Sequence, residues 1–278
     1  MWSTSGLFIR LVDWHPVVIA GSRSFFAAFF LLALRLFFTG GRNTSNPKAV
    51  LKTLRRETPV LALCGLGYAS TMILFVVANK LTASANAIIL QYTAPVWAAL
   101  LGWLFLRERP RFEHWAAIGL VGLGMFLVFQ GGFTAGALLG DITALLSGVA
   151  FAGNSVILRA RKNNNPADIM LFAHIICGAV SIPFFFLHPP VLNPKTVMCI
   201  TFMGLIQIGT ASALFAYGIK RIPAVQAMLT AAIEPVLNPI WVLLAIGEAP
   251  ELSVIAGGGI IIVAVVFSST LSALRRRN

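Results

Sequence analysis

Four polar residues recur at intervals of four in the apolar segment 224–246. They are Gln226, Thr230, Glu234 and Asn238. In a helix this spacing places them on one face, which should look inward. An acid among apolar residues is costly and usually faces a cavity or a partner, so Glu234 could bind an ammonium group of a solute or carry a coupling proton. The alternative is structural: Glu234 bonds backbone groups freed by Pro235, which has no N–H.

Other apolar segments carry aromatic and amide side chains at helical spacing, and together these could line one cavity. The candidates are Trp2, Tyr68, Phe75, Asn79, Gln91, Tyr92, Asn154, Gln207 and Tyr217. Aromatic rings offer stacking and apolar contact while amides orient a few polar groups, so such a lining suits a small amphipathic solute. Alternatively, Tyr and Trp mark membrane interfaces, and Asn or Gln bonds a neighbouring helix.

Two prolines hold equivalent places in their segments, Pro95 and Pro235. Each is interpreted either as a bend about which half a helix tilts or as a static kink. Arg23 is seven residues into its segment, a rise of roughly 10 Å, so we expect it to snorkel to the outer surface or to pair with Asp13. His174 has no nearby acid and is expected to be a hydrogen-bonded core residue.

Residue patterns typical of enzymes and metal sites are missing from the sequence. It has no HExxH, no GxSxG and no Cys/His cluster, and Asp141 has no second intramembrane aspartate with which to share a proton. Cys64, Cys177 and Cys199 lie singly in apolar segments and are expected to pack in the core. We therefore expect no catalytic residue, no cofactor and no metal.

The elements that must position these side chains are membrane helices. Of the 278 residues, 58% are hydrophobic and only 11% are charged, which leaves too little polar surface for a soluble fold. Apolar stretches long enough to cross the roughly 30 Å hydrocarbon layer recur along the chain. The expected helices are 16–38, 59–79, 82–106, 112–130, 137–159, 167–187, 196–218, 224–246 and 252–271. Residues 1–10 would form part of a tenth, truncated helix, and we expect the native chain to begin upstream.

The positive charge follows the connections between these helices. The net charge is +12, but the cations are dispersed among loops, so no nucleic-acid partner is expected. With ten helices and a cytoplasmic N-terminus, one side receives Arg35, Arg42, Lys48, Lys52, Arg55, Arg56, Arg107, Arg109, Arg111, Arg159, Arg161, Lys162, Lys220, Arg221, Arg275, Arg276 and Arg277. Only Arg10, Lys80 and Lys195 fall on the other side. Because cations favour cytoplasmic loops, both termini are predicted to be cytoplasmic.

An internal repeat divides the chain into 1–133 and 134–278. Sliding the sequence by 140 residues places Phe75 on Phe215 and the Pro95-Val96 pair on Pro235-Val236. Near the N-terminus the run from Trp2 to Arg10 aligns with the run from Phe151 to Arg159. Each copy has five helices, and because five is odd the second copy enters the membrane from the opposite side, which relates the halves as inverted repeats.

Several runs give the sequence a family resemblance. They are Trp2-Ser3-Thr4-Ser5-Gly6, Pro16 to Arg23, Ala94-Pro95-Val96 to Arg107-Glu108, and Glu234-Pro235-Val236 to Gly247-Glu248. In these the chain resembles the EamA branch of the drug/metabolite transporter superfamily, which has ten helices in paired five-helix domains. Within that branch it is most similar to bacterial amino-acid and metabolite exporters, including the YddG-like aromatic amino acid exporters. The family carries the Glu-Pro pair regardless of substrate, which favours a structural or gating role for it.

The resemblance and the inverted halves together imply a function. We expect an exporter of small amphipathic metabolites, including aromatic amino acids, that works by alternating access around a central cavity in the bacterial inner membrane. The alternatives are a carrier of drugs or other metabolites, and a non-transporting sensor or assembly subunit. The partners would be the solute and the lipid bilayer. Glycine runs at Gly119, Gly122, Gly124 and Gly257 to Gly259 would pack the halves together or form a homodimer.

Overall fold

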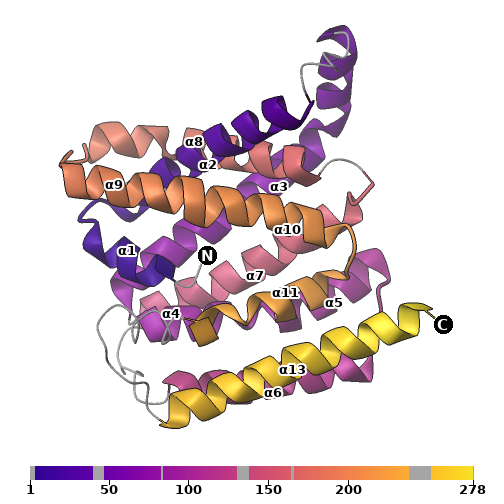
Figure 1. The fold of residues 1–278 in the computed structure, drawn as a ribbon. Coiled ribbons are helices and arrows are strands. Elements are labelled where there is room, and N and C mark those ends of the chain that lie inside the picture. Colours follow the sequence, from indigo (N-terminus) through magenta and orange to yellow (C-terminus); the bar gives the residue numbers. More distant parts are fainter. Residues whose placement is uncertain are drawn as a thin grey trace.

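The computed structural model describes residues 4–39, 47–82, 84–129, 138–163, 166–237 and 252–277, and these residues form a bundle of helices (Figure 1). The elements are α1 Ser5–Leu11, α2 Pro16–Thr39, α3 Pro47–Leu81, α4 Ser84–Gln91, α5 Ala94–Leu106, α6 Phe112–Phe129, α7 Leu138–Ala160, α8 Pro166–Leu187, α9 Pro194–Phe202, η2 Met203–Thr210, α10 Ala211–Ile219, α11 Ala224–Ala231 and α13 Leu252–Arg277. Each expected helix from 16 to 271 coincides with helical residues where the structure describes it, apart from Thr82 and the turns at residues 92–93 and 232–233.

Seven segments of the described chain are long and apolar enough to cross a membrane. They are Pro16–Phe37, Pro59–Leu81, Asn86–Leu106, Leu138–Ala160, Pro166–Leu187, Pro194–Ile219 and Leu252–Leu274. Two further apolar helices, Phe112–Val128 and Ala224–Leu237, are shorter within the same residues. The protein is therefore a multi-pass membrane protein, and the total of ten spans remains a prediction.

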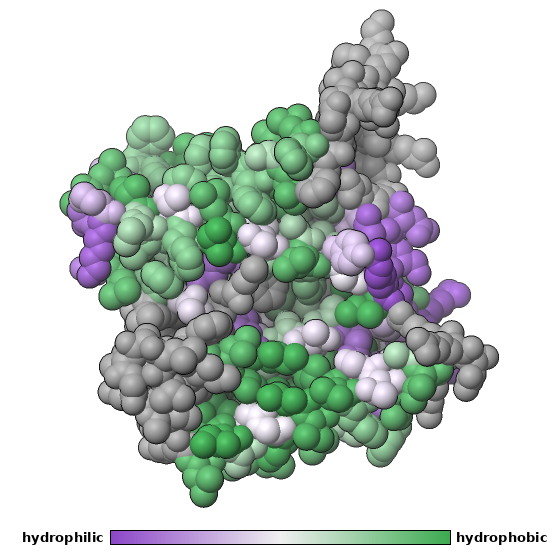
Figure 2. Space-filling model, viewed as in Figure 1, coloured by the Kyte–Doolittle hydropathy of each residue, from purple (hydrophilic) through white to green (hydrophobic). Residues whose placement is uncertain are grey.

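The outer surface of the bundle is apolar. Large side chains such as Phe25, Phe29, Leu104 and Phe105 are more than half exposed, and Figure 2 shows hydrophobic residues over much of the visible face. A soluble monomer rarely exposes so large an apolar area. In a bilayer the same surface faces lipid, and the helices satisfy their backbone groups internally.

Helices from the two sequence halves interleave. Helix α2 packs on α8 and η2, α3 on α7 and α8, and α6 on α13; the last two run side by side along one edge of the bundle in Figure 1. A Cβ at Gly124 would lie 2.7 Å from the Gly257 oxygen, and a Cβ at Gly257 would lie 2.5 Å from the Gly124 oxygen. These two glycines of the expected small-residue runs therefore allow α6 and α13 to touch within one chain.

Both halves interrupt a helix at the same place. The α4–α5 span breaks into a turn at residues 92–93, and the α11 span breaks at residues 232–233, before a helical turn at 234–237. These breaks are 140 residues apart, which is the offset of the sequence repeat. Pro95 and Pro235 each follow their break after one intervening residue, and a proline leaves the carbonyl four residues earlier without its helical donor. The repeat is therefore visible in the backbone as well as in the residue types.

The connections that carry most cations meet at one end of the bundle. The α5–α6, α7–α8 and α10–α11 connections and the C-terminal end of α13 lie on the right in Figure 1, where Figure 2 shows hydrophilic residues. Arg159 joins three of these regions. Its Nε lies 2.9 Å from Glu108 Oε1, and its Nη1 donates to the carbonyls of Ile219 and Lys220 at 3.1 and 3.0 Å.

Candidate functional site

A small polar and aromatic cavity lies in the interior, between helices of both halves. It has a volume of about 40 Å³, room for a water molecule rather than for a solute, since ligand pockets measure roughly 300–1,000 Å³. Its lining residues are Ser5, Arg23, Tyr68, Thr71, Met72, Phe75, Gln91, Tyr92, Phe151, Asn154, Met170, Ile208, Phe215 and Glu234. Both helix breaks contribute residues to this lining: Gln91 and Tyr92 come from the first break, and Glu234 comes from the second.

Six of the residues expected to line a cavity do so here. They are Tyr68, Phe75, Gln91, Tyr92, Asn154 and Glu234. The two amides are already held in place: Gln91 Nε2 donates to Ser147 Oγ at 2.8 Å, and Asn154 Oδ1 accepts from Cys64 Sγ at 2.8 Å. Fixed amides next to aromatic rings give a wall that can orient a polar group of a solute while it holds an apolar one.

Glu234 and Tyr92 meet at the second helix break. The Tyr92 hydroxyl lies 2.7 Å from Glu234 Oε2 and 2.8 Å from the Ala231 carbonyl oxygen. Ala231 is four residues before Pro235, so its carbonyl is the one that the proline leaves without a helical donor. The contact with this freed carbonyl is therefore made by Tyr92, a residue of the first half, rather than by Glu234. Glu234 remains turned to the cavity.

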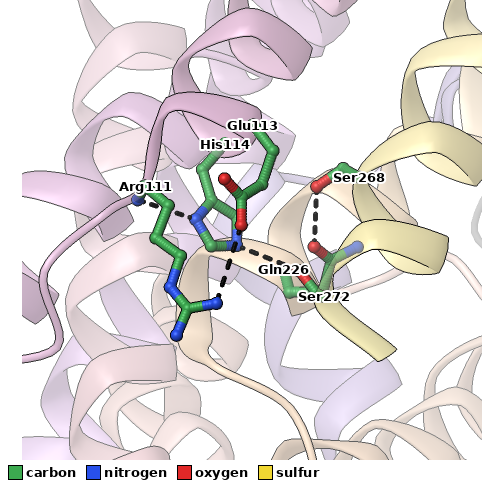
Figure 3. A network of polar contacts seen from close by, with 6 residues as sticks. All are labelled: Arg111, Glu113, His114, Gln226, Ser268 and Ser272. Atoms are coloured by element: carbon green, nitrogen blue, oxygen red, sulfur yellow. Dashed lines mark hydrogen bonds and ion pairs between the residues drawn. The ribbon is translucent and has the colours of Figure 1, made fainter. Parts of the chain in front are cut away.

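Over residues 224–237, the part of the expected helix that the structure describes, the single polar face is not formed. Gln226 bonds α13 instead, since its Oε1 accepts from Ser268 Oγ and its Nε2 donates to Ser269 Oγ; Figure 3 shows the Ser268 contact beside His114, Arg111 and Glu113. Thr230 is exposed, and its hydroxyl donates to the Gln226 carbonyl. The reason is the turn at residues 232–233, which takes Glu234 out of helical register with the residues before it.

Three other expected residues lie outside the cavity lining. Asn79 is buried and donates to the Phe75 carbonyl at 2.9 Å, while Tyr217 is 62% exposed and lies under the Arg221 guanidinium. Gln207 is buried in η2, where it accepts from Ser5 Oγ and donates to Thr4 Oγ1. Gln207 therefore holds the start of α1, whose Ser5 does reach the cavity. Trp2 and Asn238 lie outside the described residues.

The segment that carries Gln207 is a π-helix of eight residues, Met203–Thr210. Such segments are rare and occur often at functional sites. Gly204 allows its close approach to α2, because a Cβ there would lie 2.9 Å from the Arg23 carbonyl oxygen and 2.4 Å from Phe26 Cβ. The π-helix thus places Ile208 and, through Gln207, Ser5 at the cavity.

The expectation that Arg23 anchors at the outer surface is wrong. Arg23 is 2% exposed and lines the cavity. A position seven residues into α2 is compatible with snorkelling. The sequence does not indicate to which side of the helix the Arg23 side chain points, because α2 is apolar on every side. The helix turns Arg23 inward, where α2 meets η2.

Sequence reasoning also missed Ser5, Phe151 and Phe215, although the repeat contained the signal. Phe215 aligns with Phe75, and Ser5 aligns with Asn154; all four line the cavity. Residues that match across the repeat therefore meet at the junction of the halves. Choosing the repeat partner of each candidate would have found these residues.

A much larger hollow, about 910 Å³, lies between α2 and α8. Its wall includes Phe25, Phe29, Ile175 and Ile182, which are large apolar side chains exposed on the outside of the bundle. A hollow of this kind faces the acyl chains of the bilayer. The small interior cavity, with its charged and amide groups, is therefore the candidate site.

Within the described residues, no group of three His, Cys, Asp or Glu side chains is placed to hold a metal ion. Cys64, Cys177 and Cys199 are buried free thiols, as expected for core packing. His174 is fully buried, with its Nε2 2.9 Å from Ser212 Oγ, and its ring lies at 4.5 Å and at a steep angle to Tyr68. It is a hydrogen-bonded core residue, as the sequence predicted.

Fold and site together define a helical membrane protein with a small amphipathic cavity between two sequence-related halves. The description "EamA-like transporter family" matches residues 1–130 and again residues 138–270. The chain belongs to this family, and the expectation of two copies of one EamA unit is confirmed. The division at residue 133 stays a prediction.

Relatives and a solved structure agree with this assignment. The chain is 29% identical over 195 residues to the uncharacterized transporter YwfM of Bacillus subtilis, covering 68% of this chain and 66% of that protein, just under two thirds. It is 26% identical to an uncharacterized transporter of Archaeoglobus fulgidus, covering 84% of each. It is 28% identical to the pseudopaline exporter CntI of Pseudomonas aeruginosa, covering 76% of this chain and 75% of that protein. A protein crystal structure matches the fold with a TM-score of 0.81 at 20% identity, covering 97% of this chain and 93% of that chain. The protein is a membrane transporter rather than an enzyme.

Proposed function

We propose that the protein exports small amphipathic metabolites, with amino acids including aromatic ones as the first candidates, by alternating access. The observation that carries the proposal is the cavity at the two helix breaks, where charged, amide and aromatic side chains from both halves meet. A solute would sit there with its polar groups on the amides and charges and its apolar part on the rings of Phe75, Phe151 and Phe215.

The small volume of the cavity supports a closed conformation. At about 40 Å³ it cannot admit an amino acid, so transport requires the walls to separate. The breaks before Pro95 and Pro235 provide places where half a helix can tilt. If the halves are inverted repeats, a movement that opens one side has a counterpart that opens the other.

The charge distribution supports the orientation. The connections rich in Lys and Arg gather at one end of the bundle (Figure 1), and such connections favour the cytoplasm. We therefore place both termini in the cytoplasm and the protein in a bacterial inner membrane. The named exporter among the relatives favours outward transport, and a drug or other metabolite carrier of the same fold is the alternative.

Purified protein in liposomes tests the proposal. Vesicles loaded with radiolabelled amino acids should release at least one of them faster than protein-free vesicles do. Equal release from both for amino acids and for a panel of other amphipathic metabolites would overturn the transport claim.

The same vesicles test whether Glu234 carries a coupling proton. A flux that responds to a pH gradient, with the response lost in Glu234→Gln, assigns the proton to Glu234. The matched control is Glu113→Gln, which neutralises a buried acid outside the cavity lining, at the Arg111 end of α6 (Figure 3). An unchanged response in Glu234→Gln would remove the proton role, and a wild-type flux without any pH response would indicate downhill transport.

A further inference from the structure

Arg23 is a buried cation without a counter-charge in contact. It is 2% exposed, and its Nε and Nη1 are buried and have no hydrogen-bond partner among the described residues. A desolvated guanidinium with unpaired donors is strongly unfavourable. Its side chain lies in the wall of the central cavity. An unpaired buried cation at a cavity is a place where an anionic group of a ligand would be stabilised.

Glu234, the acidic group of the same cavity, does not satisfy Arg23. Its contact is the Tyr92 hydroxyl, and the described residues show no ion pair between Glu234 and Arg23. One cavity therefore holds a cation from α2 and an acid from the second helix break, separated from each other. The remaining wall is largely aromatic and apolar, with Phe75, Phe151 and Phe215.

We propose, on the basis of the transport function proposed above, that Arg23 binds the carboxylate of the transported solute while Glu234 receives its ammonium group. The substrate class is then zwitterionic: amino acids and their derivatives that keep both groups, with an apolar or aromatic side chain packed on the three phenylalanine rings. A guanidinium suits this role because it stays charged and offers several N–H donors in one plane, which matches carboxylate geometry.

The charges of Arg23 and Glu234 would make this binding site selective for zwitterionic solutes. A solute that lacks the carboxylate leaves Arg23 buried and unpaired, and a solute that lacks the ammonium leaves Glu234 with the Tyr92 hydroxyl but without a counter-charge. Sites built around a buried polar group reject analogues that cannot pair with it, because the protein group then loses water without gaining a partner. A neutral amphipathic solute pairs with neither Arg23 nor Glu234, so both free-energy costs oppose its binding.

Three related solutes test the proposal in liposomes that contain the full chain. The probes are phenylalanine, phenethylamine, which lacks the carboxylate, and 3-phenylpropionate, which lacks the ammonium. For the wild type we expect phenylalanine to be transported at least about tenfold more efficiently than either analogue, the cost of one unpaired charge-assisted hydrogen bond. Equal transport of phenylalanine and phenethylamine by the wild type would overturn the role of Arg23, with no variant needed.

Variants then separate recognition from a structural role. Arg23→Gln should lower phenylalanine transport about tenfold or more without lowering phenethylamine transport, so the ratio between the two solutes should fall, while Arg23→Lys should restore part of this ratio. Glu234→Gln should weaken the discrimination against 3-phenylpropionate. If Arg23→Gln lowers the transport of all three solutes by the same factor, Arg23 has a structural role and the proposal fails.

The experiments distinguish a failure of the proposed zwitterion-binding site from a failure of the proposed transport function. If vesicles with the wild-type protein transport non-zwitterionic metabolites but none of the amino acids, the zwitterion-binding site is refuted and the transport function is retained. Vesicles that move no solute of either kind would refute the transport function itself.

Discussion

Replacing Tyr92 by Phe removes one oxygen atom that contacts two acceptors. The hydroxyl lies 2.8 Å from the Ala231 carbonyl and 2.7 Å from Glu234 Oε2. Pro235 leaves the Ala231 carbonyl without its helical donor, so Tyr92→Phe leaves a partly buried acceptor with no replacement. Such a loss costs about 1–3 kcal/mol. We expect the free energy of unfolding to fall by that amount.

A second substitution makes this reasoning specific. Pro235→Ala restores the N–H that an unbroken helix would aim at the Ala231 carbonyl, so this carbonyl no longer depends on Tyr92. Tyr92→Phe should then cost about 1 kcal/mol less than it does in the wild type, the net value of one hydrogen bond. The difference between the two costs is the coupling energy of Tyr92 and Pro235.

The assay is equilibrium unfolding of the purified protein in mixed micelles, followed by circular dichroism. Tyr217→Phe is the matched control, because Tyr217 is 62% exposed and the same change there should stay within about 0.5 kcal/mol. Equal costs of Tyr92→Phe with and without Pro235 would refute the assignment of the tyrosine to the carbonyl freed by the proline.

Three further predictions concern the ends of the helices. Arg159→Met, measured in the same assay, should cost about 1–3 kcal/mol because it leaves three acceptors without their donor, while Lys162→Met, an exposed neighbour, should stay within about 0.5 kcal/mol; equal effects would contradict the bridging role. Arg107 has a φ of 57°, so Arg107→Gly should raise the free energy of unfolding by about 1 kcal/mol, and a decrease would argue against this strain. Burial, and then the His188 ring stacked at 4.2 Å, lower the pKa of His15 below 6.5. The folded protein therefore takes up fewer protons than the unfolded chain as pH falls through 6.5, so melting temperature should fall from pH 7.5 to 5.5. The fall should be smaller in His188→Gln, and an equal fall in both would refute the coupling.

Helix positions were predictable because each apolar run is long and each connection is polar. The two breaks were foreseeable as well, since Pro95 and Pro235 remove a helical hydrogen bond. Their consequence was harder to see. A turn at residues 232–233 shifts the helical phase, so Glu234 enters the cavity while Thr230 points outward.

The direction of a side chain was the main limit of sequence reasoning. In a soluble helix the polar side marks the surface, but in a membrane helix both lipid and core are apolar, so this signal is lost. The sequence alone therefore predicts a cavity position for Tyr217, which is exposed, and a surface position for Arg23, which is buried. The repeat carried the better signal, because Ser5 and Phe215 align with predicted lining residues.

One labelling measurement tests the central claim, that a solute reaches this cavity from each side of the membrane in turn. Phe215→Cys is introduced into a chain in which Cys64, Cys177 and Cys199 are replaced by Ala, and oriented vesicles are treated with a membrane-impermeant thiol reagent from either side. The account predicts reaction of the new cysteine from both sides, slowed by a transported amino acid. Reaction from one side only, or from neither, would contradict it.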